Sequence, residues 1–172
     1  MDVYLVRHCQ TSASLGTCYG QTDMPLAPDW QQQLPSIQCC LPSTALVFSS
    51  PLSRCLQLAQ ALSDDVRIDD RLVELNFGAW ENRLFSALPE AELRDWCEHY
   101  LDAAPPDGES FTQLQQRVQA FYQDLTALNA ASVVIVTHAG VIRALLTIHH
   151  GISAEQAFAL SVEFASVHRL TL

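Results

Sequence analysis

The sequence contains no lysine, so each of its 9 permanently positive side chains is an arginine. They are outnumbered by 19 aspartates and glutamates, which gives the 172 residues a formal net charge of -10 at pH 7. This charge argues against binding nucleic acid or an anionic membrane over a broad surface. An anionic ligand would have to bind in a local pocket, where the planar guanidinium of arginine makes forked contacts with phosphate oxygens.

Long apolar runs and paired cysteine motifs are also missing. No run approaches the ~20 residues that a membrane-spanning helix requires, and residues 1–6 lead into a strand pattern without a charged leader or cleavage site. The 6 cysteines form no Cys-x-x-Cys pair, so neither a zinc site nor a disulfide framework is indicated. We therefore expect one cytoplasmic domain whose thiols are reduced and half-buried.

Three short apolar runs predict buried strands, at residues 3–6, 45–48 and 132–136. None of them alternates apolar with polar residues, which is typical of strands covered on both faces of a parallel or mixed sheet. Helical patterns occupy residues 52–62, 111–128 and 141–148. The alternation predicts an α/β fold, a three-layer sandwich with a mainly parallel central sheet flanked by helices.

The remaining segments carry weaker patterns. Pro35 limits any helix between residues 29 and 40 to a short one, and residues 160–172 are compatible with a final strand. Residues 82–106, which end at a pair of prolines, are expected to form a small helical lid on the single domain.

Polar side chains follow each predicted strand: Arg7 and His8 the first, Arg54 the second, and His138 the third. Ligands of open α/β sheets bind beyond the carboxyl ends of the strands, so we expect these side chains to share one crevice. The set suits a phosphate dianion, because guanidinium groups can hold its oxygens while an imidazole attacks phosphorus. Taken singly, a histidine at a strand end is more often structural or exposed, so the prediction depends on their joint placement.

Five segments resemble, in order, motifs of the histidine phosphatase superfamily, which includes the phosphoglycerate mutases. They are Leu-Val-Arg-His-Cys-Gln-Thr at 5–11, Ser-Pro-Leu-Ser-Arg at 50–54, Glu-Leu-Asn-Phe-Gly-Ala-Trp-Glu at 74–81, Gly-Glu-Ser at 108–110 and Val-Thr-His-Ala-Gly-Val-Ile-Arg at 136–143. Any one block would be weak, but together they span nearly the whole chain. The resemblance implies a phosphoglycerate mutase-like fold.

By that resemblance, His8 is the nucleophile that becomes a phosphohistidine, Glu74 is the proton donor, and Arg7, Arg54 and His138 bind the phosphoryl group. Neither a metal ion nor an organic cofactor is implied. His8 must be neutral to attack phosphorus, so we expect its other ring nitrogen to donate to a backbone carbonyl and fix the tautomer. Because Glu74 would act first as an acid and then as a base, we expect a mildly acidic to neutral pH optimum.

Five further residues are assigned to substrate binding because they follow the two histidine motifs. They are Thr11, Ser14, Tyr19, Gln21 and Ala139. For the loop residues among them, a purely solvated role is an equal alternative.

Two residues depart from the family pattern. Cys9 stands where the family normally has glycine, and Ser14 where many relatives have an asparagine that helps to bind phosphate. A side chain at residue 9 excludes or strains a glycine-only backbone conformation, and a thiol beside the site leaves redox sensitivity open. Serine keeps a hydrogen-bond donor with a shorter reach, so we expect altered efficiency rather than loss of activity.

The short lid, the block at 74–81 and the chain length look most like the alpha-ribazole phosphatase branch, which removes a 5'-phosphate during cobalamin biosynthesis. Mutases of the family generally carry larger insertions over the site. The expected partner is a small phosphomonoester, with no nucleic acid or membrane; the oligomeric state, a homodimer included, stays open. A broad-specificity phosphatase is the alternative, and a non-catalytic phosphate-binding module is the alternative of another class.

Overall fold

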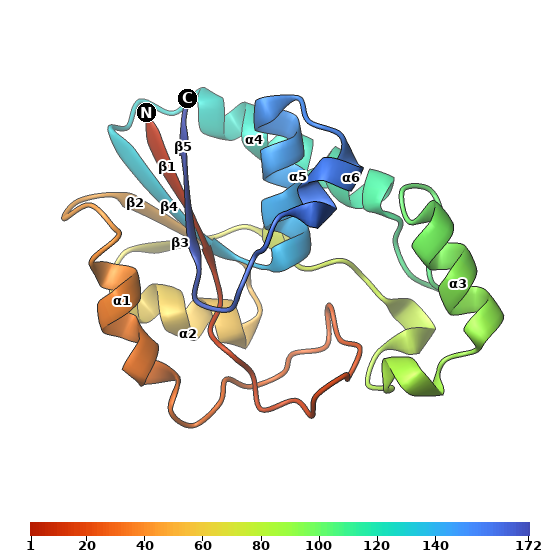
Figure 1. Ribbon diagram of the computed structural model, residues 1–172. Helices are drawn as coiled ribbons and strands as arrows, with labels where there is room; N and C mark the ends of the chain where they lie inside the picture. Colours follow the sequence, from red (N-terminus) through yellow and green to blue (C-terminus); the bar gives the residue numbers. More distant parts are fainter.

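The computed structural model describes all 172 residues and has a five-stranded sheet at its centre (Figure 1). The strands are β1 (Asp2–Arg7), β2 (Leu46–Ser49), β3 (Val66–Ile68), β4 (Ser132–Thr137) and β5 (Val167–Thr171). Their order across the sheet is β3-β2-β4-β1-β5, and all neighbours run parallel except β5, which is antiparallel to β1. The predicted mainly parallel sheet is confirmed.

Helices cover both faces of this sheet (Figure 1). They are α1 (Leu34–Gln38) and α2 (Ser53–Leu62) on one face, and α4 (Phe111–Thr126) and α5 (Ala139–His150) on the other. Along β4, Val133 and Ile135 pack into the core on the α4 and α5 side, whereas Val134 and Val136 pack on the α1 and α2 side. Because both faces are buried, successive residues must all be apolar, which explains the runs without alternation.

Several short elements lie outside the predicted ones. They are β3, α6 (Ala154–Ala159) and the 3-10 helices η2 (Asp70–Leu72) and η3 (Gly78–Trp80). Two other 3-10 helices, η1 (Trp30–Gln33) and η4 (Phe85–Ala87), fall within segments where short helical structure was expected. Of residues 160–172, only Val167–Thr171 form a strand. The segment before it passes the carboxyl end of β1, where the Ala165 amide donates to the His8 carbonyl at 3.2 Å.

The predicted lid, residues 82–106, contains η4 and α3 (Glu90–His99). α3 lies on the side of the molecule opposite α1 (Figure 1). The segment packs on a small apolar cluster of Cys18, Trp80 and Leu88, which is separate from the two main core clusters. The segment therefore packs on a cluster of its own, and its role as a lid stays a prediction.

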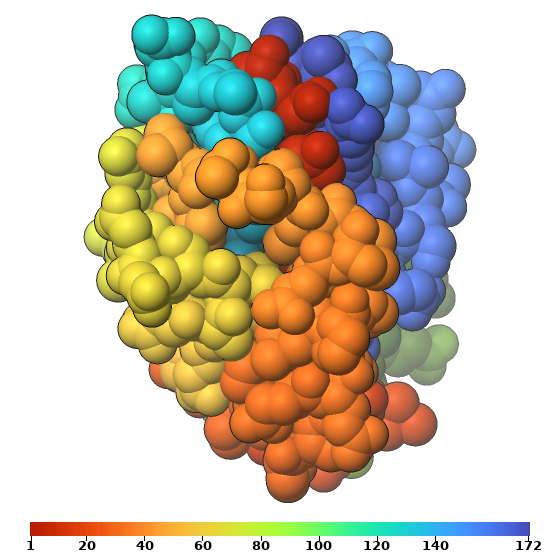
Figure 2. Space-filling view, turned by 90° about the vertical axis from the view of Figure 1, so that its left-hand side faces the viewer, coloured from red at the N-terminus to blue at the C-terminus, as the bar shows by residue number.

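The face that carries α1 and β2 has a hollow between residues 38–47 and residues 62–63 (Figure 2). Val134 of β4 lies in its wall. This hollow shares no lining residue with the cavity at the carboxyl ends of the strands. None of the helices is both long enough and apolar enough to cross a membrane.

Candidate active site

The carboxyl ends of β1, β4 and β2 meet at one edge of the sheet, because the three strands are parallel neighbours. Backbone bonds continue just past the strand ends, from His8 N to Thr137 O and from Ser50 N to Val136 O, both at 3.0 Å. A cavity of about 330 Å³ opens there, and Arg7, His8, Arg54 and Glu74 all line it. Three of the four predicted strand-end residues, Arg7, His8 and Arg54, thus share one cavity, whereas His138 is completely buried and does not line it.

His8 is buried at the cavity wall, with 3% of its surface exposed. Its Nδ1 lies 2.7 Å from the Cys9 carbonyl oxygen, which can only accept, so Nδ1 carries the hydrogen and Nε2 the free electron pair. Burial, reinforced by the charges of Arg54 and Arg7, lowers the pKa of His8 to about 3. The ring is therefore neutral near pH 7, and the predicted tautomer is confirmed.

Arg7 is held by the segment that precedes β5. Its Nη1 donates to the Val162 carbonyl at 2.6 Å, and its guanidinium carbon lies 3.8 Å from the centroid of the Phe164 ring. Its Nε is buried without a hydrogen-bond partner. Burial lowers the pKa of Arg7, but a guanidinium keeps its charge in proteins. Phe164 thus holds a permanent positive charge flat against the cavity wall.

Arg54, at the start of α2, is fully buried and lines the same cavity. Its Nη1 donates to Thr22 O at 2.9 Å, its Nη2 to Gly20 O at 2.5 Å, and its Nε to His138 Nδ1 at 3.3 Å. These bonds occupy three of the five N–H groups of the guanidinium. Two remain, the number that a forked contact with a phosphate uses.

His138 lies behind Arg54 and is completely buried. Its Nδ1 faces Arg54 and its Nε2 lies 2.8 Å from the Ser50 hydroxyl, while its ring centroid is 5.1 Å from that of His8. Burial, with the Arg54 charge next in weight, lowers the pKa of His138 well below its usual value. A neutral His138 orients Arg54 here, and its binding to a phosphoryl group stays a prediction.

Glu74 lines the cavity together with His8. One carboxyl oxygen accepts from its neighbour Leu75 N at 2.8 Å, and the other from Gly140 N, in the first turn of α5, at 3.2 Å. A Cβ on Gly140 would lie 2.3 Å from Glu74 Oε1. The missing side chain of Gly140 therefore makes room for the carboxyl group.

Glu81 anchors the loop that holds Arg54. Its carboxylate accepts from the amides of Gln21 (2.8 Å) and Thr22 (2.6 Å), from the Thr22 hydroxyl, and from Phe77 N. Burial acts to raise the pKa of Glu81, but these hydrogen bonds outweigh it and lower that pKa. The resulting carboxylate connects the block at 74–81 to the loop that binds Arg54, a role that sequence reasoning missed.

Of the five residues assigned to substrate binding, Thr11, Ser14 and Tyr19 line the cavity. The Thr11 hydroxyl donates to the Tyr19 hydroxyl at 2.9 Å. Gln21 and Ala139 do not line it: the Gln21 side chain donates to the Glu74 carbonyl at 3.2 Å, and Ala139 begins α5. The contacts of all five with a substrate stay predictions.

Three phenylalanines line the cavity without having been predicted to do so: Phe77, Phe85 and Phe164. Phe77 lies within the block at 74–81, whereas Phe85 and Phe164 lie outside all the recognised motifs. Arg143, on α5, is half-buried, with its guanidinium carbon 5.4 Å from the Phe158 ring centroid. No cluster of three or more His, Cys, Asp or Glu side chains has a geometry that could hold a metal ion.

Cys9 fits without backbone strain, since its φ angle is not among the positive ones. Its side chain is completely buried in the core cluster with Val6 and Ile37. Burial raises the pKa of the thiol to about 11, so the sulfur is protonated near neutral pH and a poor nucleophile. The carbonyl contact to His8 is kept despite the absence of glycine.

Comparisons with known proteins agree with this geometry. The family model described as the histidine phosphatase superfamily (branch 1) matches residues 3–172. The adenosylcobalamin/alpha-ribazole phosphatase of Escherichia coli (strain K12) is 29% identical over 95% of this chain and 86% of its own. The crystal structure of the alpha-ribazole phosphatase from Shigella flexneri has a TM-score of 0.90 at 29% identity, covering 100% of this chain and 91% of its own. A phosphoglycerate mutase from Thermus thermophilus has a TM-score of 0.78 at 30% identity, covering 99% and 92%.

Proposed function

The chain belongs to branch 1 of the histidine phosphatase superfamily, and from that premise we propose that it hydrolyses phosphomonoesters through a phosphohistidine on His8, without a metal ion. The observation that carries the proposal is the state of His8, whose ring is neutral with its Nε2 electron pair free. Arg7, Arg54 and Glu74 line the same cavity. A nucleophile, two fixed cations and a carboxyl group are the parts that a two-step phosphoryl transfer needs.

In the first step, His8 Nε2 attacks phosphorus and forms the N–P bond as the ester P–O bond breaks. Glu74 gives its proton to the leaving oxygen, while Arg7 and Arg54 stabilise the charge on the remaining phosphoryl oxygens. In the second step, water attacks phosphorus and loses a proton to Glu74, and the N–P bond breaks. Inorganic phosphate leaves, and His8 is again neutral with its hydrogen on Nδ1.

The cavity also bears on the leaving group. Among its lining residues, Arg7 and Arg54 are the only cations, and the wall around them contains Tyr19, Phe77 and Phe85. A carboxylate or a second phosphate on the substrate would find no further positive partner. This supports a monophosphate ester of an uncharged alcohol that carries an aromatic group, and we propose alpha-ribazole 5'-phosphate, an intermediate of cobalamin biosynthesis, as the substrate.

The test is steady-state hydrolysis of alpha-ribazole 5'-phosphate beside phosphoserine, 3-phosphoglycerate and p-nitrophenyl phosphate, with EDTA present. A preference for alpha-ribazole 5'-phosphate of about 100-fold in kcat/KM, or about 2.7 kcal/mol, would support this substrate. A flat profile would leave a broad-specificity phosphatase. His8→Ala should abolish turnover and the acid-labile phosphoenzyme, and tight phosphate binding without any turnover would favour a binding module.

A further inference from the structure

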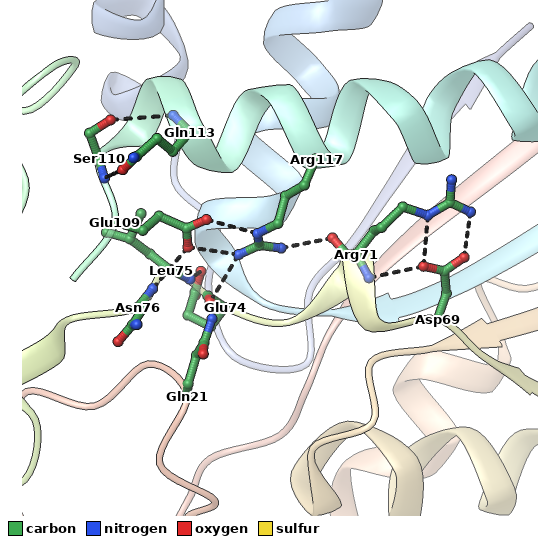
Figure 3. A network of polar contacts seen from close by, with 10 residues as sticks. All are labelled: Gln21, Asp69, Arg71, Glu74, Leu75, Asn76, Glu109, Ser110, Gln113 and Arg117. Carbon is green, nitrogen blue, oxygen red and sulfur yellow. Dashed lines mark hydrogen bonds and ion pairs between the residues drawn. The ribbon is translucent and has the colours of Figure 1, made fainter. Parts of the chain in front are cut away.

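Arg117, on α4, reaches the backbone that carries Glu74 (Figure 3). Its Nη2 donates to the Glu74 carbonyl at 3.0 Å, and its Nη1 to the Arg71 carbonyl at 2.7 Å. The side chain is 21% exposed and does not line the cavity. Arg117 therefore contacts Glu74 from outside the cavity and cannot touch a bound substrate.

Glu109 extends this attachment beyond Glu74. Its carboxylate accepts from Arg117 Nε (2.8 Å) and Nη2 (2.9 Å), and also from Asn76 N (3.0 Å). The Glu109 amide in turn donates to the Asn76 carbonyl at 2.9 Å. The ion pair thus holds the chain before, at and after the proton donor, as the dashed contacts in Figure 3 show.

Two different helices consequently hold Glu74, one at its backbone carbonyl and the other at its side-chain carboxylate. Its carbonyl is bound from α4 by Arg117, and its carboxylate is bound by Gly140 N of α5. The two helices pack directly on each other in one core cluster. We propose that Arg117, paired with Glu109, is a positioning residue that sets the carboxyl group of Glu74 at proton-transfer distance from the leaving oxygen.

A purely structural ion pair is the competing explanation. The geometry favours positioning because two of the three groups that Arg117 binds are backbone carbonyls of the segment leading to Glu74. Removing Arg117 would take away the donor to the Arg71 carbonyl and leave the Glu74 carbonyl with only the longer bond from Gln21, at 3.2 Å. Glu109 would lose its cation as well, so the segment would relax. The loss should then be specific to the step in which Glu74 gives its proton.

This inference rests on the proposed function, and leaving-group dependence tests it. The variants are Arg117→Met and Arg117→Lys, with glycerol 2-phosphate as a poor leaving group and p-nitrophenyl phosphate as a good one. In Arg117→Met, kcat/KM for glycerol 2-phosphate should fall about 10- to 100-fold, and that for p-nitrophenyl phosphate less than about 3-fold. Arg117→Lys should recover part of the loss, since one ammonium can still donate to the Glu74 carbonyl.

Arg71→Met is the matched control. The Arg71 side chain pairs with Asp69 (Figure 3) and with Asp124, whereas Arg117 binds only the Arg71 carbonyl, which the substitution retains. It should leave the ratio of the two kcat/KM values unchanged. Should Arg117→Met fold poorly, the double variant Arg117→Met with Glu109→Gln removes the unpaired charge and should show the same selective loss. Equal losses on both substrates, or no loss, would overturn the positioning role.

A wild-type protein without turnover on either substrate would instead refute the proposed function. A crystal structure of the double variant then decides the positioning separately. A Glu74 carboxylate displaced from Gly140 N would support it, and an unmoved carboxylate would overturn it.

Discussion

Adding one methyl group at Gly140 should lower the activity of this protein while leaving its free energy of unfolding nearly unchanged. In Gly140→Ala, the new Cβ would lie 2.3 Å from Glu74 Oε1, 3.2 Å from Leu114 Cδ2 and 3.3 Å from Glu74 Cδ. An ordinary contact begins at 3.4 Å, so the carboxyl group has to retreat by about 1 Å. The methyl group thus displaces the Glu74 carboxyl group without altering its chemistry.

A misplacement of this size costs on the order of 10²-fold in rate when the displaced group takes part in the reaction. We expect about that loss in kcat/KM for glycerol 2-phosphate, whose alkoxide needs a proton to leave. The loss for p-nitrophenyl phosphate should stay below about 10-fold, since that leaving group departs unprotonated. In a helix, alanine is favoured over glycine by up to about 1 kcal/mol, which offsets part of the contact with Leu114.

The assay pairs the two kcat/KM values with urea unfolding of the same variant. The free energy of unfolding should change by no more than about 1 kcal/mol. Thr147→Ala, two turns farther along α5, is the control and should leave both substrates unaffected. Wild-type activity of Gly140→Ala on glycerol 2-phosphate, or equal losses on both substrates, would refute the assignment of Glu74 as the proton donor.

Two further predictions concern His8 and Phe164. Because the folded pKa of His8 is about 3, below its ordinary 6.5, the unfolded chain binds a proton that the folded chain does not. The contribution of a neutral His8 to the free energy of unfolding is complete above pH 6.5 and decreases as the pH falls. The decrease is about 2 kcal/mol between pH 8 and pH 5. When the free energy of urea unfolding is plotted against pH, His8→Asn should lack this contribution to the slope. Identical slopes for the variant and the wild type would contradict the prediction. Phe164→Leu removes the ring over Arg7, so the inhibition constant of inorganic phosphate should rise about 3- to 10-fold, and an unchanged constant would count against that contact.

The sheet and the strand-end residues were predictable because burial on both faces leaves a strong pattern. Residues 133–136 are apolar without a break, as expected of β4, which lies at the centre of the sheet. β3 was not predictable. An edge strand of three residues is too short to show a pattern of apolar and polar residues, and its Ile68 is 55% exposed. α6 was missed although Ser153 and Gln156 form a capping box that sequence inspection can detect.

The candidate site was predictable where motifs exist, and less so where contacts come from distant segments. His8 and Arg54 follow strands within recognisable blocks, and the structure brings them to one cavity. Phe164 reaches the cavity through a segment whose Ala165 adopts a φ of 60°, which no local residue pattern signals. Arg117 has a weak signal, because it flanks the buried stripe of α4 beside Leu114 and Val118, where a charged residue needs a partner.

The environment of Cys9 has a consequence for how such enzymes are found. The contact that orients His8 comes from a main-chain carbonyl, and the Cys9 side chain points into the core beside Val6. Any small side chain that fits this core and accepts a negative φ satisfies both requirements. A search pattern that demands glycine after the nucleophilic histidine would overlook such chains, whereas one that allows alanine, serine or cysteine at this position would retrieve them.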